Sequence, residues 1–201
     1  MQKIMFNDRY GLTDAVIEGR KTMTRRLIPD EFFGLTWDTR GDTLVYENEY
    51  GDFIDVRHST YTRYKVGEVV AVAQSYGQVY HHYGLETMDM VVSGMKTSAG
   101  WKNKMFVKAE LVPHQIRITR IRCERLQDIS DEDCMKEGVV DVTYFKTGGR
   151  PYELFALPGH EYEETFNTPR QAFAALIDKV SGRGTWDRNP WVAVYEFELV
   201  K

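Results

Sequence analysis

A cluster of cations and hydroxyls near the N-terminus holds the residues best suited to chemistry. Residues 19–26 read Gly-Arg-Lys-Thr-Met-Thr-Arg-Arg, so four cationic and two hydroxyl side chains lie within eight positions. Like charges this close repel one another unless an anionic ligand or a carboxylate from elsewhere in the chain compensates them. An RNA phosphate and a distant glutamate are both suitable, and the cluster alone leaves the choice open.

The combination of Lys21 with Thr24 permits nucleophilic chemistry. A threonine hydroxyl attacks an amide carbonyl only if a base accepts its proton. Lysine is such a base when its pKa falls from ~10.4 toward neutrality. Arg20, Arg25 and Arg26 favour that fall, whereas a carboxylate beside the lysine stabilises the ammonium and opposes it.

The elements that position this cluster are a short helix, a turn and a strand. Apolar residues at helical spacing predict a helix over residues 12–18, which Gly19 ends. The threonine-rich segment 22–27 is expected to be a strand. Residues three apart point to opposite faces of a strand, so Lys21 and Thr24 share a site only if Lys21 belongs to the turn.

Two further strands are predicted in the middle third of the chain. Residues 69–73 predict a central apolar strand that ends at Gln74. Residues 115–126 predict a basic strand whose apolar phase slips between Ile118 and Ile121, which is typical of a β-bulge. Its arginines, at 117, 120, 122 and 125, form either a stripe that faces RNA or an ordinary solvated strand surface.

The last third of the chain predicts two helices and a final strand. Ser130 and Gly138 are expected to begin and end a helix over residues 129–138. Glu137 opposes the helix dipole in its last turn, so it is either exposed or faces a cation such as Lys21. A longer helix is expected over 168–182. A strand over 192–200 should place one face in the core and suggests closure of a barrel.

Length and composition favour one globular domain over residues 1–201, with insertions at about 30–62, 77–103 and 140–167. The first insertion resembles a β-meander, and the aromatic third insertion is either a lid or an interaction flap.

The formal net charge of −4 argues against a histone-like binder. Two cysteines without disulfide or zinc spacing fit a reducing cytoplasm, and no apolar run is long enough to cross a membrane. The adjacent His81 and His82 lack a companion ligand set and are expected to be exposed loop residues, so neither a metal nor a cofactor is expected.

Four segments in order resemble one known family, the ASCH domain, and more narrowly its larger phage and prophage-type members. They are the 19–26 cluster, Tyr64-x-Val66-Gly67-Glu68, residues 124–130 with Glu137-Gly138, and residues 189–192 with 195–197. The resemblance extends over about half of the chain, and the rest consists chiefly of residues 30–62, 77–103 and 140–167. The resemblance implies an α+β, mainly β fold: a PUA-like barrel flanked by short helices, with β-rich insertions.

The resemblance also implies binding of RNA, a nucleotide or a modified nucleoside in a cleft lined by Lys21, Thr24, Arg26 and Glu137. The alternative that it offers is an amidohydrolase that deacylates a nucleoside such as 4-acetylcytidine. Thr24 would then be the nucleophile, Lys21 the base and Glu137 a third catalytic residue. The binding residues expected around this centre are Arg20, Thr22, Arg25, Arg26, Gln74, Tyr76, Arg117 and Arg122.

Two considerations weaken a catalytic role. Many larger family members carry an acidic residue where this chain has Gln74, and glutamine cannot act as a base. A purely structural alternative has Lys21 and Glu137 joined in an ion pair that only stabilises the barrel. The natural ligand, the oligomeric state and the purpose of the insertions do not follow from the sequence.

Overall fold

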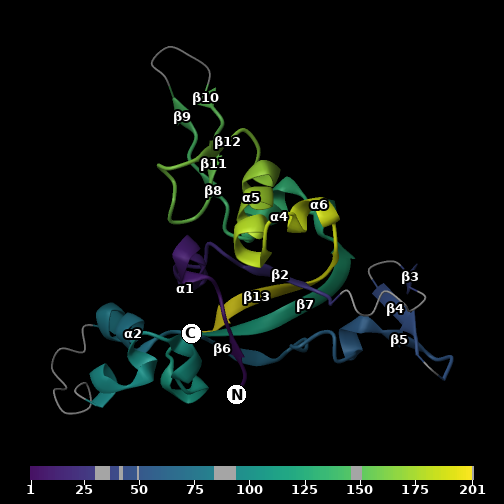
Figure 1. Cartoon of the computed structure of the whole chain (residues 1–201), viewed down its shortest axis with the longest axis horizontal. Helices are drawn as coiled ribbons and strands as arrows, with labels where there is room; N and C mark the ends of the chain where they lie inside the picture. The colour runs from purple at the N-terminus through teal and green to yellow at the C-terminus, as the bar shows by residue number, and fades with distance from the viewer. Residues whose placement is uncertain (30–36, 41–42, 49, 84–93, 146–150, 201) are drawn as a thin grey trace.

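A five-stranded sheet organises the molecule (Figure 1). The computed structural model describes residues 1–29, 37–40, 43–48, 50–83, 94–145 and 151–200. The strand order is β1-β6-β7-β13-β2, with β1 parallel to β6 and the other neighbours antiparallel. The strands are β1 (Lys3–Ile4), β6 (Val69–Val72), β7 (Gln115–Arg125), β13 (Trp191–Val200) and β2 (Met23–Leu27).

The pairing between the two long central strands, β7 and β13, shifts its register by one residue part-way along their length. Glu196 of β13 pairs with Arg120, but the next residue, Phe197, pairs with Ile118, so Thr119 is an extra residue in β7. This irregularity confirms the β-bulge expected from the slip in the apolar phase. Because of it, Ile118 and Ile121 enter the same core although they are three residues apart.

Several helices cover one side of the sheet: α1 (Leu12–Ile17), α4 (Asp131–Lys136), α5 (Pro169–Ser181) and α6 (Thr185–Arg188) (Figure 1). Their ends follow the expected capping. Ser130 accepts a hydrogen bond from the backbone of Asp133, and Thr168 accepts one from Gln171. The 3₁₀ turns Asp8–Tyr10 and Leu126–Asp128 precede α1 and α4.

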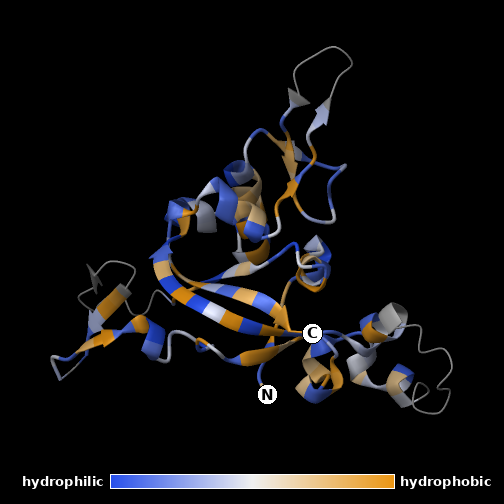
Figure 2. Ribbon diagram, turned by 180° about the vertical axis from the view of Figure 1, so that it is seen from behind, coloured by the Kyte–Doolittle hydropathy of each residue, from blue (hydrophilic) through white to orange (hydrophobic). Residues whose placement is uncertain are grey.

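Strand β13 buries both of its faces, not one as predicted. Ala193, Tyr195 and Phe197 pack into the larger core, while Val192 and Val194 pack into a second core beneath α4 and α5. Figure 2 shows hydrophobic and hydrophilic residues alternating along the long strands. The sequence shows the alternation along β13, but it does not show that α5 packs on the second face of this strand.

The expected insertions lie around this centre (Figure 1). The predicted meander is present as β3 (Trp37–Arg40), β4 (Thr43–Glu47) and β5 (Phe53–Asp55), followed by the 3₁₀ turn Val56–His58. The third insertion forms a sheet of β8 (Val140–Asp141), β11 (Phe155–Ala156) and β12 (Thr165–Phe166). The hairpin of β9 (Tyr144–Phe145) and β10 (Pro151–Tyr152) extends from it.

The segment 77–103 does not match the expected β-rich insertion. Its described part is helical, with α2 (Tyr76–Tyr83) and the 3₁₀ turn Ala99–Trp101; the turns Lys104–Phe106 and Ala109–Leu111 follow. His81 and His82 therefore belong to a helix and not to a loop. Val107, Ala109 and Val112 pack this region against Ala71 of β6.

The described strands pair as an α+β fold with an open sheet, so the predicted closure of a barrel is not observed among them. The two edge strands, β1 and β2, are nevertheless linked by a hydrogen bond from the Arg26 guanidinium to the carbonyl of Met5. No helix in the described part of the chain has the length and apolar character of a membrane span.

Candidate functional site

A buried ion pair joins the two ends of the expected site. Lys21 Nζ lies 2.6 Å from Glu137 Oε2 and donates a second hydrogen bond, of 2.7 Å, to the backbone carbonyl of Glu137. Lys21 is 2% exposed and Glu137 4%. The charge of Lys21 is therefore compensated by a distant glutamate of the same chain, one of the two partners that the cation cluster suggested.

Backbone contacts bring the pair together. The amide of Lys21 donates to Ala15 O at the end of α1, and the amide of Thr22 donates to Lys136 O at the end of α4. Lys21 thus lies in the turn before β2, as the shared site required. Gly138 has a φ of +106°, and a Cβ built there would lie 3.7 Å from Lys21 Cδ. A glycine lets the chain leave α4 in that conformation beside the lysine.

The second carboxylate oxygen of Glu137 binds Arg25, which anchors a wider network. Arg25 Nη1 lies 3.1 Å from Glu137 Oε1, and its Nη2 lies 2.6 Å from Glu124 Oε1 and 3.1 Å from Asp133 Oδ2. The guanidinium also lies 5.9 Å from the centre of the Phe173 ring. Arg25 is buried, so three carboxylates compensate one desolvated cation.

Arg122 extends the same network along β7. It pairs with Glu124, with Asp133 of α4 and with Glu196 of β13. Glu124 and Asp133 therefore each bridge two arginines. Asp133 lies in the first turn of α4, where an acid is favoured by the helix dipole alone, so its position in the sequence did not indicate these partners.

Thr24 lies with Lys21, Arg25, Arg26 and Glu137 in the lining of a cavity of about 260 Å³. Its apolar walls come mainly from Phe6, Leu12 and the α5 residues Phe173, Leu176 and Ile177. The Thr24 hydroxyl makes no hydrogen bond to any described residue, yet no fully buried side-chain polar atom in that part of the chain lacks a partner. The hydroxyl must therefore reach the cavity surface.

The electrostatics of Lys21 follow from its burial. Burial lowers the pKa of Lys21 below its ordinary value of 10.5, and Arg26 and Arg25 act in the same direction, whereas Glu137 opposes the shift. The arginines thus have the expected sign, but desolvation is the larger cause. Glu137 favours the ammonium form, in which the amine is a hydrogen-bond donor and not a base.

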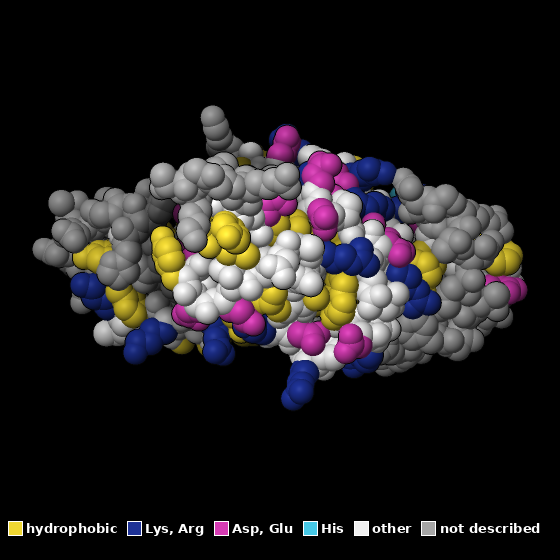
Figure 3. All heavy atoms as spheres, turned by 90° about the horizontal axis from the view of Figure 1, so that it is seen from above, with side chains coloured by type: hydrophobic (Ala, Val, Ile, Leu, Met, Phe, Trp, Pro, Cys, Tyr) yellow, Lys and Arg dark blue, Asp and Glu magenta, His cyan; other side chains and the backbone are white. Residues whose placement is uncertain are grey.

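The other expected binding residues lie outside this cavity's lining. Arg20 is exposed and pairs with Glu18, and the backbone of Thr22 bonds to Lys136 and Phe197. Gln74 is buried, with its Oε1 2.8 Å from His114 Nδ1, and Tyr76 begins α2. Arg117 pairs with Glu198 at 3.0 Å. Figure 3 shows acidic and basic side chains interspersed on the face seen from above.

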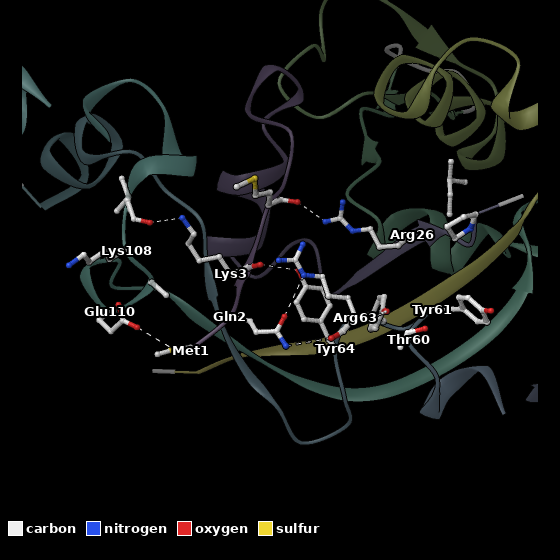
Figure 4. Close-up of a pocket in the computed structure, with 16 residues that line it drawn as sticks. Met1, Gln2, Lys3, Arg26, Thr60, Tyr61, Arg63, Tyr64, Lys108 and Glu110 are labelled. Carbon is white, nitrogen blue, oxygen red and sulfur yellow. Dashed lines mark hydrogen bonds and ion pairs between the residues drawn. The ribbon is translucent and has the colours of Figure 1, made fainter. Parts of the chain in front are cut away.

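A second and larger cavity, of about 880 Å³, lies between the edge strands β1 and β2 (Figure 4). Arg26 and Leu27 line both cavities. The remaining lining comes from the N-terminal strand, residues 60–64 and residues 107–110, together with Pro29 and Tyr195. No sequence motif pointed to this cavity, because its walls come from five parts of the chain that are distant in sequence.

Comparisons with known protein families, sequences and structures found no match: no family model, curated protein or solved structure matches the chain. Among the described residues, no group of three or more histidine, cysteine, aspartate or glutamate side chains is arranged to hold a metal ion.

Proposed function

We propose that the chain is an ASCH-type module that binds a nucleobase, as part of a modified nucleoside or an RNA, in the 260 Å³ cavity. The observation that carries the proposal is the charge balance of the lining. Lys21 and Arg25 are both paired with carboxylates, so the cavity offers polar groups without a large excess of positive charge. Such a site favours an uncharged polar group over a phosphate.

The size and walls of the cavity support the same ligand. Pockets for drug-sized ligands measure roughly 300–1,000 Å³, so this cavity suits a ring and not a complete nucleotide. Phe6, Phe173 and Leu176 supply apolar surface for a planar ring. The free Thr24 hydroxyl can both donate and accept a hydrogen bond at a base edge.

Titration calorimetry with cytidine and 4-acetylcytidine tests this proposal. Wild-type protein should bind at least one of them, and Thr24→Val should weaken binding because it removes the hydroxyl with little change in volume. Thr22→Val is the matched control, since Thr22 lies on the same segment but outside the cavity lining. Equal affinities for the two variants, or no binding by the wild type, would reject the assignment.

A second candidate function is hydrolysis of the amide in 4-acetylcytidine. It rests on the free Thr24 hydroxyl and on the lowered pKa of Lys21 in the same lining. Thr24 Oγ1 would attack the acetyl carbonyl and pass its proton to Lys21. Breakage of the C–N bond would release cytidine with that proton, and water would then hydrolyse the acetyl-threonine to acetate.

The base role places a condition on the ion pair. Lys21 can accept a proton only as the neutral amine, so its proton must first move to Glu137 or to solvent. Both carboxylate oxygens of Glu137 already accept hydrogen bonds, Oε1 from Arg25 Nη1 at 3.1 Å and Oε2 from Lys21 Nζ at 2.6 Å. Chromatography of 4-acetylcytidine incubations tests the reaction: cytidine should appear with the wild type and not with Thr24→Ala. Absence of cytidine with the wild type would exclude this substrate.

For the fold, we propose that the five-stranded sheet belongs to a PUA-like barrel. It is supported by the bond between Arg26 and Met5, which links the two edges of the open sheet. In a closed or nearly closed barrel, the backbone amides of β1 and β2 should be protected from hydrogen exchange to a similar extent as those of β7. Rapid exchange throughout both edge strands would argue for an open sheet.

A further inference from the structure

The larger cavity differs from the smaller one in the state of its cations. Lys3, Arg26, Arg63 and Lys108 line it, and none of them makes an ion pair with any described residue. Its one acidic residue, Glu110, lies 3.6 Å from the amino group of Met1. Positive charge in this lining therefore exceeds negative charge, which is the reverse of the compensated network around Lys21 and Arg25.

Two arginines remain available to an anion in this cavity. The Arg26 guanidinium gives one hydrogen bond through Nη2 to the Met5 carbonyl, and Arg63 makes a long bond of 3.4 Å through Nε to Gln2 Oε1. Each guanidinium carries five N–H donors, so most donors on both are unused among the described residues. Lys3 is different, because its ammonium already donates to the carbonyls of residues 104, 105 and 107.

Aromatic side chains line the same cavity. Tyr61 and Tyr64 follow the β3–β5 meander, and Tyr195 comes from β13. The Arg63 guanidinium lies 5.7 Å from the centre of the Tyr64 ring, and Figure 4 shows Arg63 and Tyr64 side by side, with Thr60 and Tyr61 beyond them. Tyrosine faces beside unpaired guanidinium groups suit a ligand that combines a planar ring with an anionic group.

We propose that the 880 Å³ cavity is a binding site for a phosphate ester that carries a planar ring, of the nucleoside monophosphate class. Arg26 and Arg63 would bind the phosphate oxygens, and Tyr61 or Tyr64 would contact the ring. The volume lies within the range of pockets that enclose whole small ligands, roughly 300–1,000 Å³. This site goes beyond the function proposed for the smaller cavity and does not depend on it.

Calorimetry with cytidine 5′-monophosphate, cytidine and inorganic phosphate tests the proposal on the full chain. The monophosphate should bind more tightly than inorganic phosphate, because it adds the ring contact. Arg63→Gln should weaken its binding by about tenfold or more, the effect of losing a charge-assisted hydrogen bond. Arg183→Gln is the control, since Arg183 is an exposed arginine that lines neither cavity.

A second variant separates this site from the smaller cavity without removing charge. Thr60 is exposed and lines only the larger cavity, so Thr60→Trp should obstruct it and leave the fold intact. Both Thr60→Trp and Arg63→Gln should weaken the monophosphate and leave cytidine binding unchanged. Circular dichroism verifies that both variants fold.

The proposal is overturned if the wild type does not bind the monophosphate, or if both variants bind it as the wild type does. Loss of cytidine binding in Thr24→Val with retention of monophosphate binding would support two separate sites. If the wild type binds neither cytidine nor 4-acetylcytidine, only the function of the smaller cavity is rejected, because the monophosphate measurement does not use that cavity.

Discussion

Lys21 Nζ and Glu137 Oε2 lie 2.6 Å apart although 116 positions separate the two residues in the chain. The pair connects the turn before β2 with the end of α4, and so it holds an edge strand against the helical layer. The same two side chains line the smaller cavity. Structure and function therefore draw on one contact, and experiments must separate the two roles.

Lys21→Met should destabilise the protein strongly. Breaking a buried ion pair by removing one partner costs about 3–5 kcal/mol, because the remaining charge is desolvated and less well compensated. Arg25 still binds Glu137 in the variant, so the expected loss is at the lower end, about 3 kcal/mol. Urea unfolding followed by circular dichroism measures it.

Arg20→Met is the matched control for this substitution. Arg20 pairs with Glu18 on the surface, where an ion pair contributes only about 0–1 kcal/mol. Equal free energies of unfolding for the two variants would show that the buried pair does not stabilise the fold.

Gly138→Ala should destabilise the protein more than Gly19→Ala. Gly138 has a φ of +106°, and its added Cβ would lie 3.4 Å from Leu12 Cδ2, so strain of about 1–3 kcal/mol is expected. Gly19 has a φ of +74° with no atom within 4 Å of a Cβ, and only the left-handed penalty of about 1–2 kcal/mol applies. Thermal unfolding of both variants gives the comparison, and a smaller loss at 138 would contradict it.

The two thiols should make the protein less stable as the pH rises above 9. Burial raises the pKa of Cys123 and of Cys134 from 9.0 to about 12. Between these values the unfolded chain has released protons that the folded chain retains, so the free energy of unfolding falls with rising pH. Burial raises the pKa of Tyr195 to about 12 as well, which adds a similar loss above pH 10.

Unfolding curves at several alkaline pH values measure this dependence. Cys134→Ala removes one titrating thiol and should make the decline with pH shallower, even if its stability at neutral pH is lower. The native thiols should also react slowly with a thiol reagent near pH 8, because both are buried and protonated. An unchanged slope in Cys134→Ala would count against the raised pKa.

Cytidine binding in the smaller cavity should depend little on salt. Lys21 and Arg25 are internally compensated, and salt screens buried pairs far less than exposed charges. The affinity measured by calorimetry should therefore stay nearly constant from low salt to ~0.5 M. Over this range the Debye length falls below ~10 Å, so interactions between exposed charges are screened. A steep decline would mean that an uncompensated charge of the lining, such as that of Arg26, contributes to the complex.

Local features of the structure were the most predictable from sequence. Capping residues located α4 and α5, the slip between Ile118 and Ile121 located the bulge, and turn residues located the meander. These signals depend on residues a few positions apart. The meeting of Lys21 with Glu137 was one of two alternatives offered by the position of Glu137 in the last turn of a helix, and the family resemblance favoured it.

Long-range features were missed for a common physical reason. Glu124 and Asp133 were not expected to bind Arg25, because the partner of a charged side chain depends on which strands and helices become neighbours. The second buried face of β13 required knowledge of where α5 packs, and the larger cavity required five separate parts of the chain to meet. Gln74 and Tyr76 follow β6 as predicted but lie away from the smaller cavity's lining.

The extra residue at Thr119 reverses the parity of β7. Before it, the even-numbered residues 116 and 118 enter the core; after it, the odd-numbered residues 121 and 123 do so. A saturation mutagenesis scan of this strand should therefore show its intolerant positions changing from even to odd at 119. Deletion of Thr119 would instead leave Ile118 and Ile121 two positions apart, so the strand would alternate regularly along its whole length with the same side chains still facing the core.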